Sequence, residues 1–304
     1  MDTGLFDEED IVLSANGVEV GATLSIPKSK PTAGVVFLAG SGPTDRDSTL
    51  EPNKPLKDLA WGLASNAIAV ARWDKPSAES SKISDENITL QKEYLPYADA
   101  AIKALRDMLA SSDIPIFVLG HSLGAMVVPM VANADAKIKG VVMLSAAGGK
   151  MYDSALRQMK YLVSLNHEPP FATQEYVDLL SKQVAVIGKP DFNVKSKGEL
   201  PFKAPASYWF SVKEYDQVAE VKKLSIPVRI LQPERDYQVT VEDDLVMWKE
   251  GLEGKENIEI KVGEGLNHLF MAGQGPSTPD DYALEGHVEE AVVMDVCEWI
   301  KNNC

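Results

Sequence analysis

Short runs rich in β-branched residues alternate along the chain with segments of helical periodicity, and this alternation restricts the possible folds most. It is typical of βαβ units, in which a helix follows each strand of a parallel sheet. All but the last of the runs are nearly continuously apolar, as expected for strands covered on both faces. The pattern therefore predicts an α/β fold with a mostly parallel sheet and helices on both sides. The six runs lie at 34–38, 68–72, 114–119, 139–145, 226–231 and 257–262.

A hairpin is predicted ahead of these runs. Asn16-Gly17 separates two extended segments, and this dipeptide favours the two-residue turn that joins antiparallel strands. With the hairpin, the predicted sheet has eight strands, of which the first pair is antiparallel. Apolar residues at helical spacing indicate packed helices over 97–109 and 288–300.

The strand pattern lapses over residues 150–225, where helical runs alternate with prolines. The chain has 304 residues, and at roughly 150 residues per domain this length fits either two domains or one large α/β domain with an insertion. We interpret 150–225 as an inserted helical cap. Residues 1–149 and 226–304 then form a single α/β core.

A Gly-x-Ser-x-Gly motif, Gly120-His121-Ser122-Leu123-Gly124, follows the third of the predicted parallel strands. The motif requires an apolar strand before it and a helix after it, because a sharp turn lifts the serine hydroxyl out of the sheet. Glycines must flank the serine where strand and helix nearly touch. Both conditions are met, so Ser122 is predicted to be a nucleophile rather than an incidental serine in a glycine-rich turn.

A serine hydroxyl becomes a nucleophile when a histidine takes its proton, and the chain has four histidines. His121 lies inside the motif and is expected to point away from Ser122, His167 lies in the predicted cap, and His287 begins the last helix as an exposed residue. His268 follows the last predicted strand, at the carboxyl edge of the sheet where ligands bind in open α/β folds. It is therefore the predicted base.

The histidine needs a carboxylate that holds it in one tautomer, and Asp236 is the predicted residue. It lies four residues beyond the strand that ends near Gln232. Asp243 and Asp244 fall on the following helix and Glu234 lies earlier in the loop, so these are weaker candidates. An aspartate that only forms a solvated turn is the structural alternative.

The oxyanion of an acyl-transfer transition state needs hydrogen-bond donors, usually the N–H after the nucleophile and one from the loop after the first parallel strand. Leu123 supplies the first of these. In the loop 38–47, Gly40 and Gly42 allow close approach of a ligand, and Ser41 is the predicted second donor. The run Asp45-Arg46-Asp47 is either a solvated turn or an ion-pair network that braces the loop.

With these motifs in place, the chain resembles the α/β-hydrolase superfamily over nearly its whole length. The order Ser122, Asp236, His268 is the order of the catalytic triad in that superfamily. GSGPTDRD, ARWDK, LQPERDYQV and LNHLF are similar to the signature of a group of bacterial serine carboxylesterases with a helical cap. The resemblance implies hydrolysis of carboxylic esters, often with short acyl chains, by these three residues without a cofactor.

Two departures from that group affect its loops. Relatives usually have His-Gly where this chain has Ala39-Gly40, and they often continue the ARWDK segment with glycines where this chain has Pro76-Ser77-Ala78. The substrate preference of relatives therefore transfers poorly. The predicted cap holds 10 of the 22 aromatic residues, with Tyr208, Trp209 and Phe210 adjacent. They form either an apolar acyl or aryl pocket or the cap's own core.

Other activities are less compatible with these motifs. A serine at the turn disfavours reactions that need a carboxylate nucleophile, and no metal, P-loop or dinucleotide motif is present in the sequence. Thioesterase and peptidase activities on the same triad remain open, because a triad attacks any acyl carbonyl within reach. A hydrolase-like binding protein without turnover is the alternative outside the enzymes.

Composition restricts partners and location. The formal net charge is −15, which disfavours binding to nucleic acid and to anionic membrane surfaces. Cys297 and Cys304 cannot form a disulfide framework, and no signal peptide or membrane-spanning run is apparent. We therefore expect a cytoplasmic protein that binds a small-molecule ester, as a monomer or a homodimer.

Overall fold

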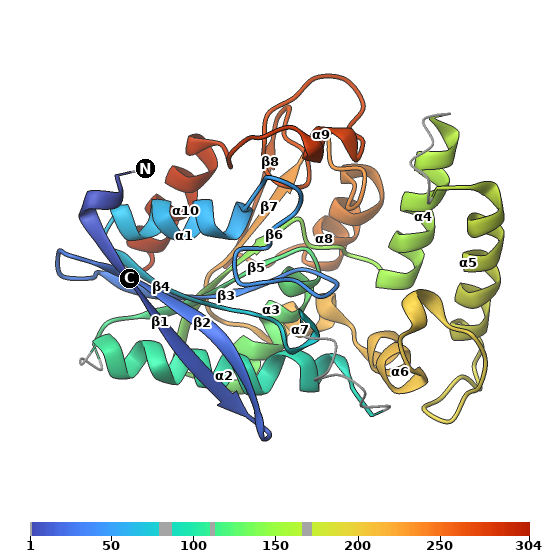
Figure 1. Cartoon of the computed structure of the whole chain (residues 1–304), viewed down its shortest axis with the longest axis horizontal. Coiled ribbons are helices and arrows are strands. Elements are labelled where there is room, and N and C mark those ends of the chain that lie inside the picture. The colour runs from blue at the N-terminus through green and yellow to red at the C-terminus, as the bar shows by residue number, and fades with distance from the viewer. Residues whose placement is uncertain (1, 79–86, 110–112, 166–171) are drawn as a thin grey trace.

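The computed structural model describes residues 2–78, 87–109, 113–165 and 172–304, and it contains one eight-stranded sheet (Figure 1). The strands are ordered β1-β2-β4-β3-β5-β6-β7-β8 across the sheet. All pairings from β4 to β8 are parallel. The predicted α/β-hydrolase fold is confirmed. The strands are β1 (Phe6–Ala15), β2 (Val18–Pro27), β3 (Ala33–Leu38), β4 (Ile68–Trp73), β5 (Ile116–His121), β6 (Ile138–Leu144), β7 (Val228–Pro233) and β8 (Ile258–Gly263).

Strands β1 and β2 form the predicted antiparallel hairpin. Asn16 and Gly17 both have positive φ angles, 52° and 76°, as the primed two-residue turn requires. Ala15 faces Val18 directly across the turn, and the pairing continues to Phe6 opposite Pro27. Strand β2 also pairs antiparallel with β4, so that the hairpin extends one side of the parallel sheet.

The parallel strands β5 and β7 begin two residues later than the sequence predicts. An Ile-Pro pair precedes each of them, at Ile114-Pro115 and at Ile226-Pro227. Proline has no N–H to donate to a sheet ladder, which excludes it from the interior of a central strand. The carbonyl group of each proline instead accepts one hydrogen bond from a neighbouring strand. Gly34 N–H donates to Pro115 O, and Val141 N–H donates to Pro227 O.

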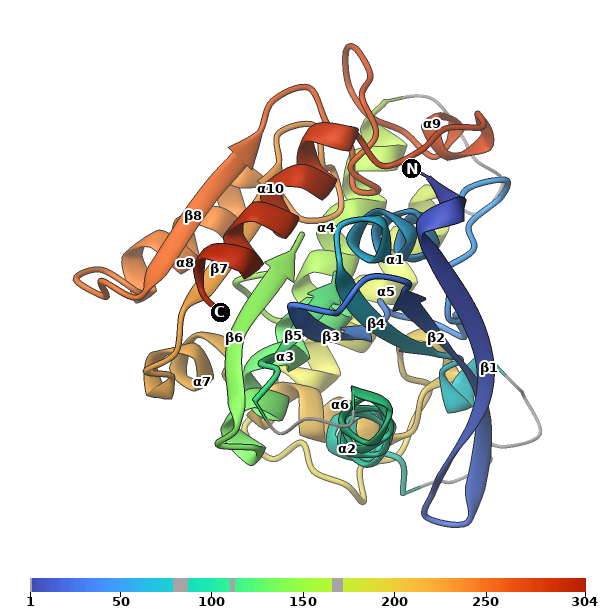
Figure 2. The same ribbon diagram turned by 90° about the vertical axis from the view of Figure 1, so that its left-hand side faces the viewer.

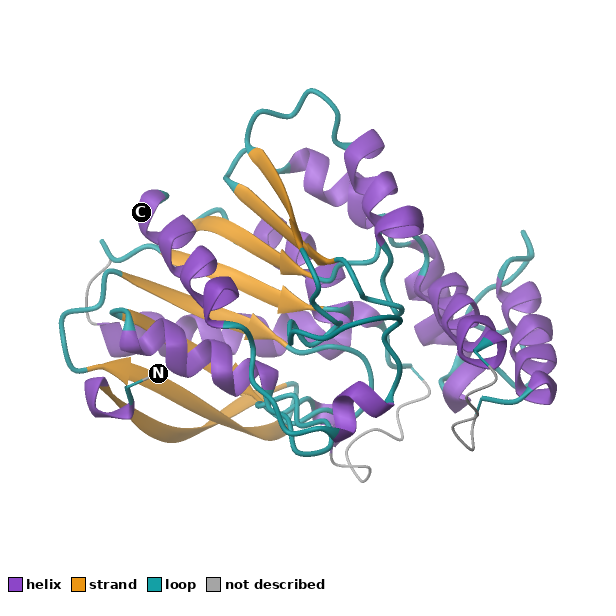
Figure 3. Cartoon of the chain, turned by 90° about the horizontal axis from the view of Figure 1, so that it is seen from above, coloured by secondary structure: helices purple, strands orange, loops and turns teal. Residues whose placement is uncertain are grey.

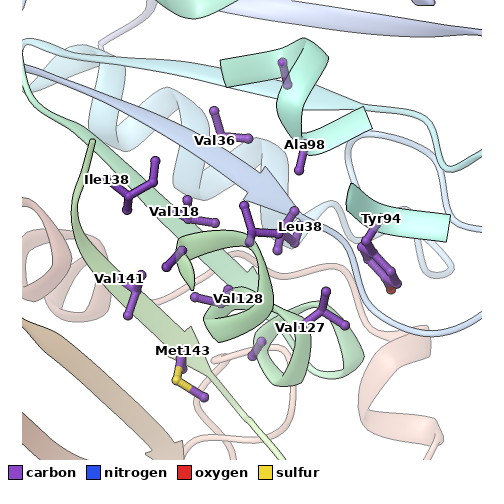
Figure 4. Close-up of a cluster of buried hydrophobic side chains, with 14 of the residues drawn as sticks. Val36, Leu38, Tyr94, Ala98, Val118, Val127, Val128, Ile138, Val141 and Met143 are labelled. Atoms are coloured by element: carbon purple, nitrogen blue, oxygen red, sulfur yellow. The ribbon is translucent and has the colours of Figure 1, made fainter. Parts of the chain in front are cut away.

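Helices cover both faces of the sheet (Figure 2). Helices α1 (Pro55–Ser65) and α10 (Glu290–Asn302) pack one hydrophobic cluster against one face. Helices α2 (Leu90–Leu109), α3 (Leu123–Ala134) and α8 (Val246–Gly251) pack the larger cluster against the other. Figure 4 shows part of the larger cluster, in which side chains of β3, β5 and β6 meet those of α2 and α3. The helices predicted over 97–109 and 288–300 are therefore present, but α2 begins earlier and α10 begins two residues later, so that His287 precedes it instead of beginning it.

In the described part of the segment between β6 and β7 there are four α-helices, and α4, α5 and α6 lie beyond the strand ends toward which the arrowheads point (Figure 3). These three share a separate hydrophobic cluster, which extends from Tyr152 to Val212. The fourth contacts α3, and its Val221 belongs to the larger core cluster. The boundaries of a cap at 150 and 225 stay a prediction. The four helices are α4 (Met151–Ser164), α5 (Gln174–Ile187), α6 (Ala206–Glu214) and α7 (Gln217–Lys223).

Short helical segments complete the described part of the chain. They are η1 (Thr3–Leu5), η2 (Pro76–Ala78), η3 (Pro201–Lys203), the π-helical turn η4 (Val241–Leu245) and α9 (Asp280–Ala283). Within the described residues, no helix is both long enough and apolar enough to cross a membrane.

Candidate active site

Ser122 occupies the sharp turn between β5 and α3. Its backbone has φ 56° and ψ −122°, a conformation that non-glycine residues rarely adopt and that marks stored strain at functional sites. The turn is held by the Ser122 N–H, which donates to Leu144 O at 2.9 Å, and by the Met126 N–H, which donates to Ser122 O at 3.2 Å. The strand, turn and helix predicted around the motif are all present.

The two glycines of the motif are required by close backbone contacts. A Cβ atom at Gly120 would lie 2.4 Å from Gly124 O, and one at Gly124 would lie 2.2 Å from Leu38 O. Any side chain at either position would force β5, α3 or the end of β3 to move. The glycines thus allow the helix to approach the sheet closely enough to fix the Ser122 turn.

Asp236 and His268 form a buried pair at the carboxyl edge of the sheet. His268 Nδ1–H donates to Asp236 Oδ2 at 2.6 Å, and both residues are almost completely buried. Asp236 Oδ1 accepts the backbone N–H groups of Gln238 at 2.8 Å and Val239 at 3.0 Å. A carboxylate held in this way fixes the tautomer of the imidazole, with Nε2 left as the acceptor.

Tight turns and contacts between loops position this pair. The buried Asn267 side chain accepts the N–H groups of Leu269 and Met271, and this folds the chain around His268. Arg235 N–H donates to Leu266 O at 2.8 Å, which joins the loop after β7 to the loop after β8. Asp236 and His268, 32 residues apart in sequence, are therefore held by the backbone as well as by their own hydrogen bond.

His121 makes a contact that the sequence did not indicate. Its Nε2–H donates to the backbone carbonyl of His268 at 2.8 Å, and the two rings lie 4.7 Å apart between centroids. Burial, reinforced by the neighbouring His268, lowers the pKa of His121 to about 3, so the ring is neutral at physiological pH. The residue before Ser122 thus holds the backbone of His268.

The remaining carboxylate candidates are engaged elsewhere. Glu234 accepts the N–H of Gly265 at 2.9 Å, Asp243 accepts the hydroxyl of Thr240, and Asp244 pairs with Arg157 of α4. Of the predicted carboxylates, Asp236 is therefore the one in contact with His268.

Among the described residues, no hydrogen bond joins Ser122 to His268. The ring of His121, the residue before Ser122, contacts the ring of His268. Catalytic hydrogen bonds are often long without substrate and tighten when substrate binds. The other two histidines lie outside the site. His287 is exposed and contacts Asp58 at 3.2 Å, and His167 lies outside the described residues.

The loop after β3 lies directly against Ser122. A Cβ atom at Gly40 would be 3.3 Å from Ser122 Cβ and 3.8 Å from Ser122 Oγ. For the run Asp45-Arg46-Asp47 that follows, the structure shows an ion-pair network rather than a solvated turn. Arg46 makes a bidentate contact with Asp74 at 3.1 and 2.6 Å, and Arg72 Nε donates to Asp47 at 3.0 Å.

A cavity of about 560 Å³ opens beside Ser122, between the sheet edge and helices α4 and α6. Ser41 and Leu123, the two predicted oxyanion donors, both line it. Most of the other lining side chains are apolar. They include Ile88, Met126, Ala147, Met151, Ala155, Phe202, Pro205 and Val239.

The three adjacent aromatics of α6 differ in position. Tyr208 and Trp209 line the cavity, whereas Phe210 is not among the described residues that line it. Trp209 is completely buried among Tyr152, Phe202 and Tyr208, and its Nε1–H donates to Pro201 O. Trp209 therefore contributes to the core of this helical cluster as well as to the cavity wall.

Comparison with known proteins relates this chain to hydrolases. A model described as the alpha/beta hydrolase family matches residues 35–285. The chain is 37% identical over 301 residues to a protein named esterase EstD from Thermotoga maritima, covering 99% of this chain and 69% of the relative.

Solved structures share the fold at low identity. The esterase Est1E from Butyrivibrio proteoclasticus gives a TM-score of 0.58 at 17% identity, covering 97% of this chain and 98% of the other. A thermostable carboxyl esterase from Bacillus coagulans gives 0.61 at 17% identity with the same coverage.

Proposed function

The chain belongs to the α/β hydrolase family as a carboxylic ester hydrolase, and we propose that Ser122, His268 and Asp236 are its catalytic triad. The observation that carries this proposal is the 2.6 Å bond between His268 Nδ1 and Asp236 Oδ2, buried at the sheet edge where the Ser122 turn also lies. The segments GSGPTDRD, GHSLG, ERDYQV and LNHLF support our further proposal that the chain belongs to the capped bacterial serine carboxylesterases.

In the acylation step, Ser122 Oγ forms a bond with the ester carbonyl carbon while His268 Nε2 accepts the hydroxyl proton. The imidazolium is stabilised by Asp236, which stays ionised. The C–O bond to the alcohol then breaks, and His268 donates the proton to the leaving oxygen. The alcohol departs and the acyl group remains on Ser122.

The negative charge that develops on the carbonyl oxygen needs preorganised donors. We assign these to the backbone N–H groups of Leu123, at the start of α3, and Ser41. Both residues line the cavity beside Ser122, which supports the assignment. The N-terminus of α3 adds a favourable dipole at the same place.

In the deacylation step, a water molecule attacks the acyl carbonyl while His268 accepts its proton. The bond to Ser122 Oγ breaks, the proton returns to Ser122, and the carboxylic acid leaves. The step needs neither a metal nor a redox partner, because every proton is moved by His268.

The cavity supports a substrate of modest size. Its volume of about 560 Å³ and its apolar wall fit a short acyl or aryl ester, with Tyr208 and Trp209 as aromatic contacts. We expect p-nitrophenyl acetate and butyrate to be hydrolysed with a much higher kcat/KM than the palmitate. A preference for palmitate would contradict this substrate class.

Labelling with a fluorophosphonate tests the nucleophile. The wild-type protein should incorporate one equivalent at Ser122, and Ser122→Ala should lose labelling and at least about 10⁴-fold of kcat. Ser145→Ala is the matched control, because Ser145 also has a positive φ, 50°, directly after a neighbouring strand, and its buried hydroxyl has no hydrogen-bond partner among the described residues. If the correctly folded wild-type protein were not labelled, the proposal would be wrong.

A further inference from the structure

The oxyanion loop, residues 39–44, is held by the segment that follows β4. Lys75 Nζ donates to Gly40 O at 2.9 Å, and Lys75 N–H donates to Thr44 O at 3.1 Å. Ser77 Oγ donates to Gly42 O at 3.3 Å. The loop is thus fixed by a neighbouring loop rather than by a ladder of its own.

Tyr94 of α2 adds a second contact to the same carbonyl. Its hydroxyl lies 2.9 Å from Ala39 O and 3.2 Å from Gly40 O, and Figure 4 shows the ring beside the end of β3. Burial raises the pKa of Tyr94 well above its ordinary value, so the hydroxyl keeps its proton and acts as a donor. The Gly40 carbonyl therefore accepts from Lys75 and shares the single hydroxyl hydrogen of Tyr94 with the Ala39 carbonyl.

Lys75 is a buried cation, 2% exposed, and its burial is offset by an ion pair. Glu93 Oε1 lies 3.0 Å from Lys75 Nζ, which also lies 4.9 Å from the centroid of the Tyr94 ring. Glu93 additionally accepts from the hydroxyl of Tyr208 at 3.2 Å, and it shares the single hydroxyl hydrogen of Ser77, 3.3 Å away, with Gly42 O. A chain of polar contacts thus runs from α6 to the oxyanion loop.

The geometry of the peptide between Gly40 and Ser41 connects these contacts to the reaction. In a trans peptide the C=O and N–H groups point in opposite directions, and the described residues contain no cis peptide bond. The Ser41 N–H therefore points away from Lys75 and Tyr94. Gly40 itself lies against Ser122, and Ser41 lines the cavity.

We propose that Lys75 and Tyr94 are positioning residues, which fix and polarise the Gly40–Ser41 peptide so that the Ser41 N–H is ready to receive the oxyanion. This inference rests on the proposed serine esterase mechanism. Hydrogen bonds to the carbonyl oxygen strengthen the N–H of the same peptide as a donor, and the cationic Lys75 strengthens it further. The ion pair with Glu93 holds the Lys75 ammonium in place.

Removing the cation should reduce transition-state stabilisation more than substrate binding. Lys75→Met alone would leave Glu93 buried and unpaired, so the double variant Lys75→Met/Glu93→Gln keeps the test interpretable if the single variant fails to fold. We expect kcat for p-nitrophenyl butyrate to fall about 10- to 100-fold, less than the loss of a whole oxyanion donor, while KM stays within about threefold.

A transition-state analogue gives a readout that a purely structural role would not change. A trifluoromethyl ketone forms an adduct with Ser122 whose oxygen takes the place of the oxyanion, so its Ki should rise by the same factor by which kcat/KM falls. Tyr94→Phe should show a smaller effect in the same direction. Tyr215→Phe is the matched control, because it removes a buried tyrosine bond of 2.8 Å to Met126 O and should leave both quantities unchanged.

The outcomes separate this inference from the mechanism on which it rests. If wild-type Ser122 is not labelled by fluorophosphonate, the proposed mechanism fails. If the wild type is labelled and active but the folded double variant keeps kcat and Ki within about threefold, only the positioning role is overturned. An increase confined to KM would also overturn it.

Discussion

The carboxyl edge of the sheet and the helical cluster of α4 to α6 form opposite walls of the same cavity, but different contacts hold them. At the edge, individual hydrogen bonds hold buried polar side chains such as Asp236, His268 and Lys75. The helical cluster is held by apolar packing around Trp209. Polar contacts require a fixed geometry, whereas apolar packing tolerates changes of shape, so the edge is suited to chemistry and the cluster to substrate choice.

The two walls are joined by few polar contacts between side chains. Arg157 of α4 pairs with Asp244, and Tyr208 of α6 contacts Glu93. Burial raises the pKa of Asp244 even though Arg157 beside it acts in the opposite direction. The comparison predicts that substitutions at the edge lower kcat or stability, whereas substitutions in the helical wall change KM.

After the nucleophile itself, the largest effect is expected at Asp236. Asp236→Asn should lower kcat by on the order of 10³- to 10⁴-fold, because an amide no longer holds the imidazole in the required tautomer. Its remaining oxygen can still accept the N–H groups of Gln238 and Val239, so the fold should persist. Steady-state kinetics with p-nitrophenyl butyrate and circular dichroism would check both statements.

Asp243→Asn serves as the control for this prediction, because Asp243 is half exposed and contacts Thr240 rather than His268. It should keep wild-type turnover. If Asp236→Asn were equally active, the carboxylate of the triad would have to lie elsewhere in the chain.

A smaller effect is expected in the pH dependence of the free energy of unfolding, and it should come from a histidine at the carboxyl edge of the sheet. The pKa of His121 is about 3 in the folded protein, below the 6.5 of an exposed histidine, so the unfolded chain binds a proton that the folded chain excludes. The contribution of neutral His121 to the free energy of unfolding is fully present above pH 6.5 and is lost as the pH falls toward 3. Between pH 6.5 and 4.5 the loss amounts to about 2–3 kcal/mol.

Urea unfolding at these pH values would test this statement. His121→Gln should flatten the decline in unfolding free energy, because glutamine does not titrate and can still donate to the carbonyl of His268. His287→Gln, at an exposed histidine, should leave the wild-type slope unchanged. An identical slope in all three proteins would assign the acid sensitivity to groups other than His121.

The smallest effect is expected in the helical wall. Phe202 lines the cavity yet is 58% exposed, so Phe202→Ala should remove substrate contact with little loss of stability. We expect KM for p-nitrophenyl butyrate to rise about three- to tenfold at unchanged kcat, which corresponds to about 1 kcal/mol of apolar contact. Val194→Ala, at an exposed residue that is not among the described lining residues, should change neither constant. A fall in kcat would remove the distinction between the two walls.

Much of the sheet could be predicted because its signals are local. Apolar runs specify the strands, Asn16-Gly17 specifies the hairpin turn, and the motif around Ser122 specifies a strand, a turn and a helix. The pairing of Asp236 with His268 also followed, since both were expected after neighbouring strands at one edge. Strand starts were less accurate, because the Ile-Pro pairs read as apolar strand residues although proline lacks the donor.

The contacts between loops could not be predicted in the same way. That His121 would hold the backbone of His268, and that Lys75 would reach the carbonyl of Gly40, depends on how loops distant in sequence meet. Lys75 lies in the segment ARWDK, but a lysine beside an aspartate indicates a surface pair until its burial is known. Which aromatics of α6 face the cavity likewise depended on the orientation of the helix.

Strand β1 ends the sheet and leaves a row of backbone groups without a neighbouring strand. Four consecutive acidic residues, Asp7 to Asp10, lie along it, and all are exposed. If a second copy added its own β1 to this edge, carboxylates would face carboxylates across the new pairing, which disfavours it. The exposed carboxylates of β1 thus disfavour the addition of a second β1 at the open edge of the sheet.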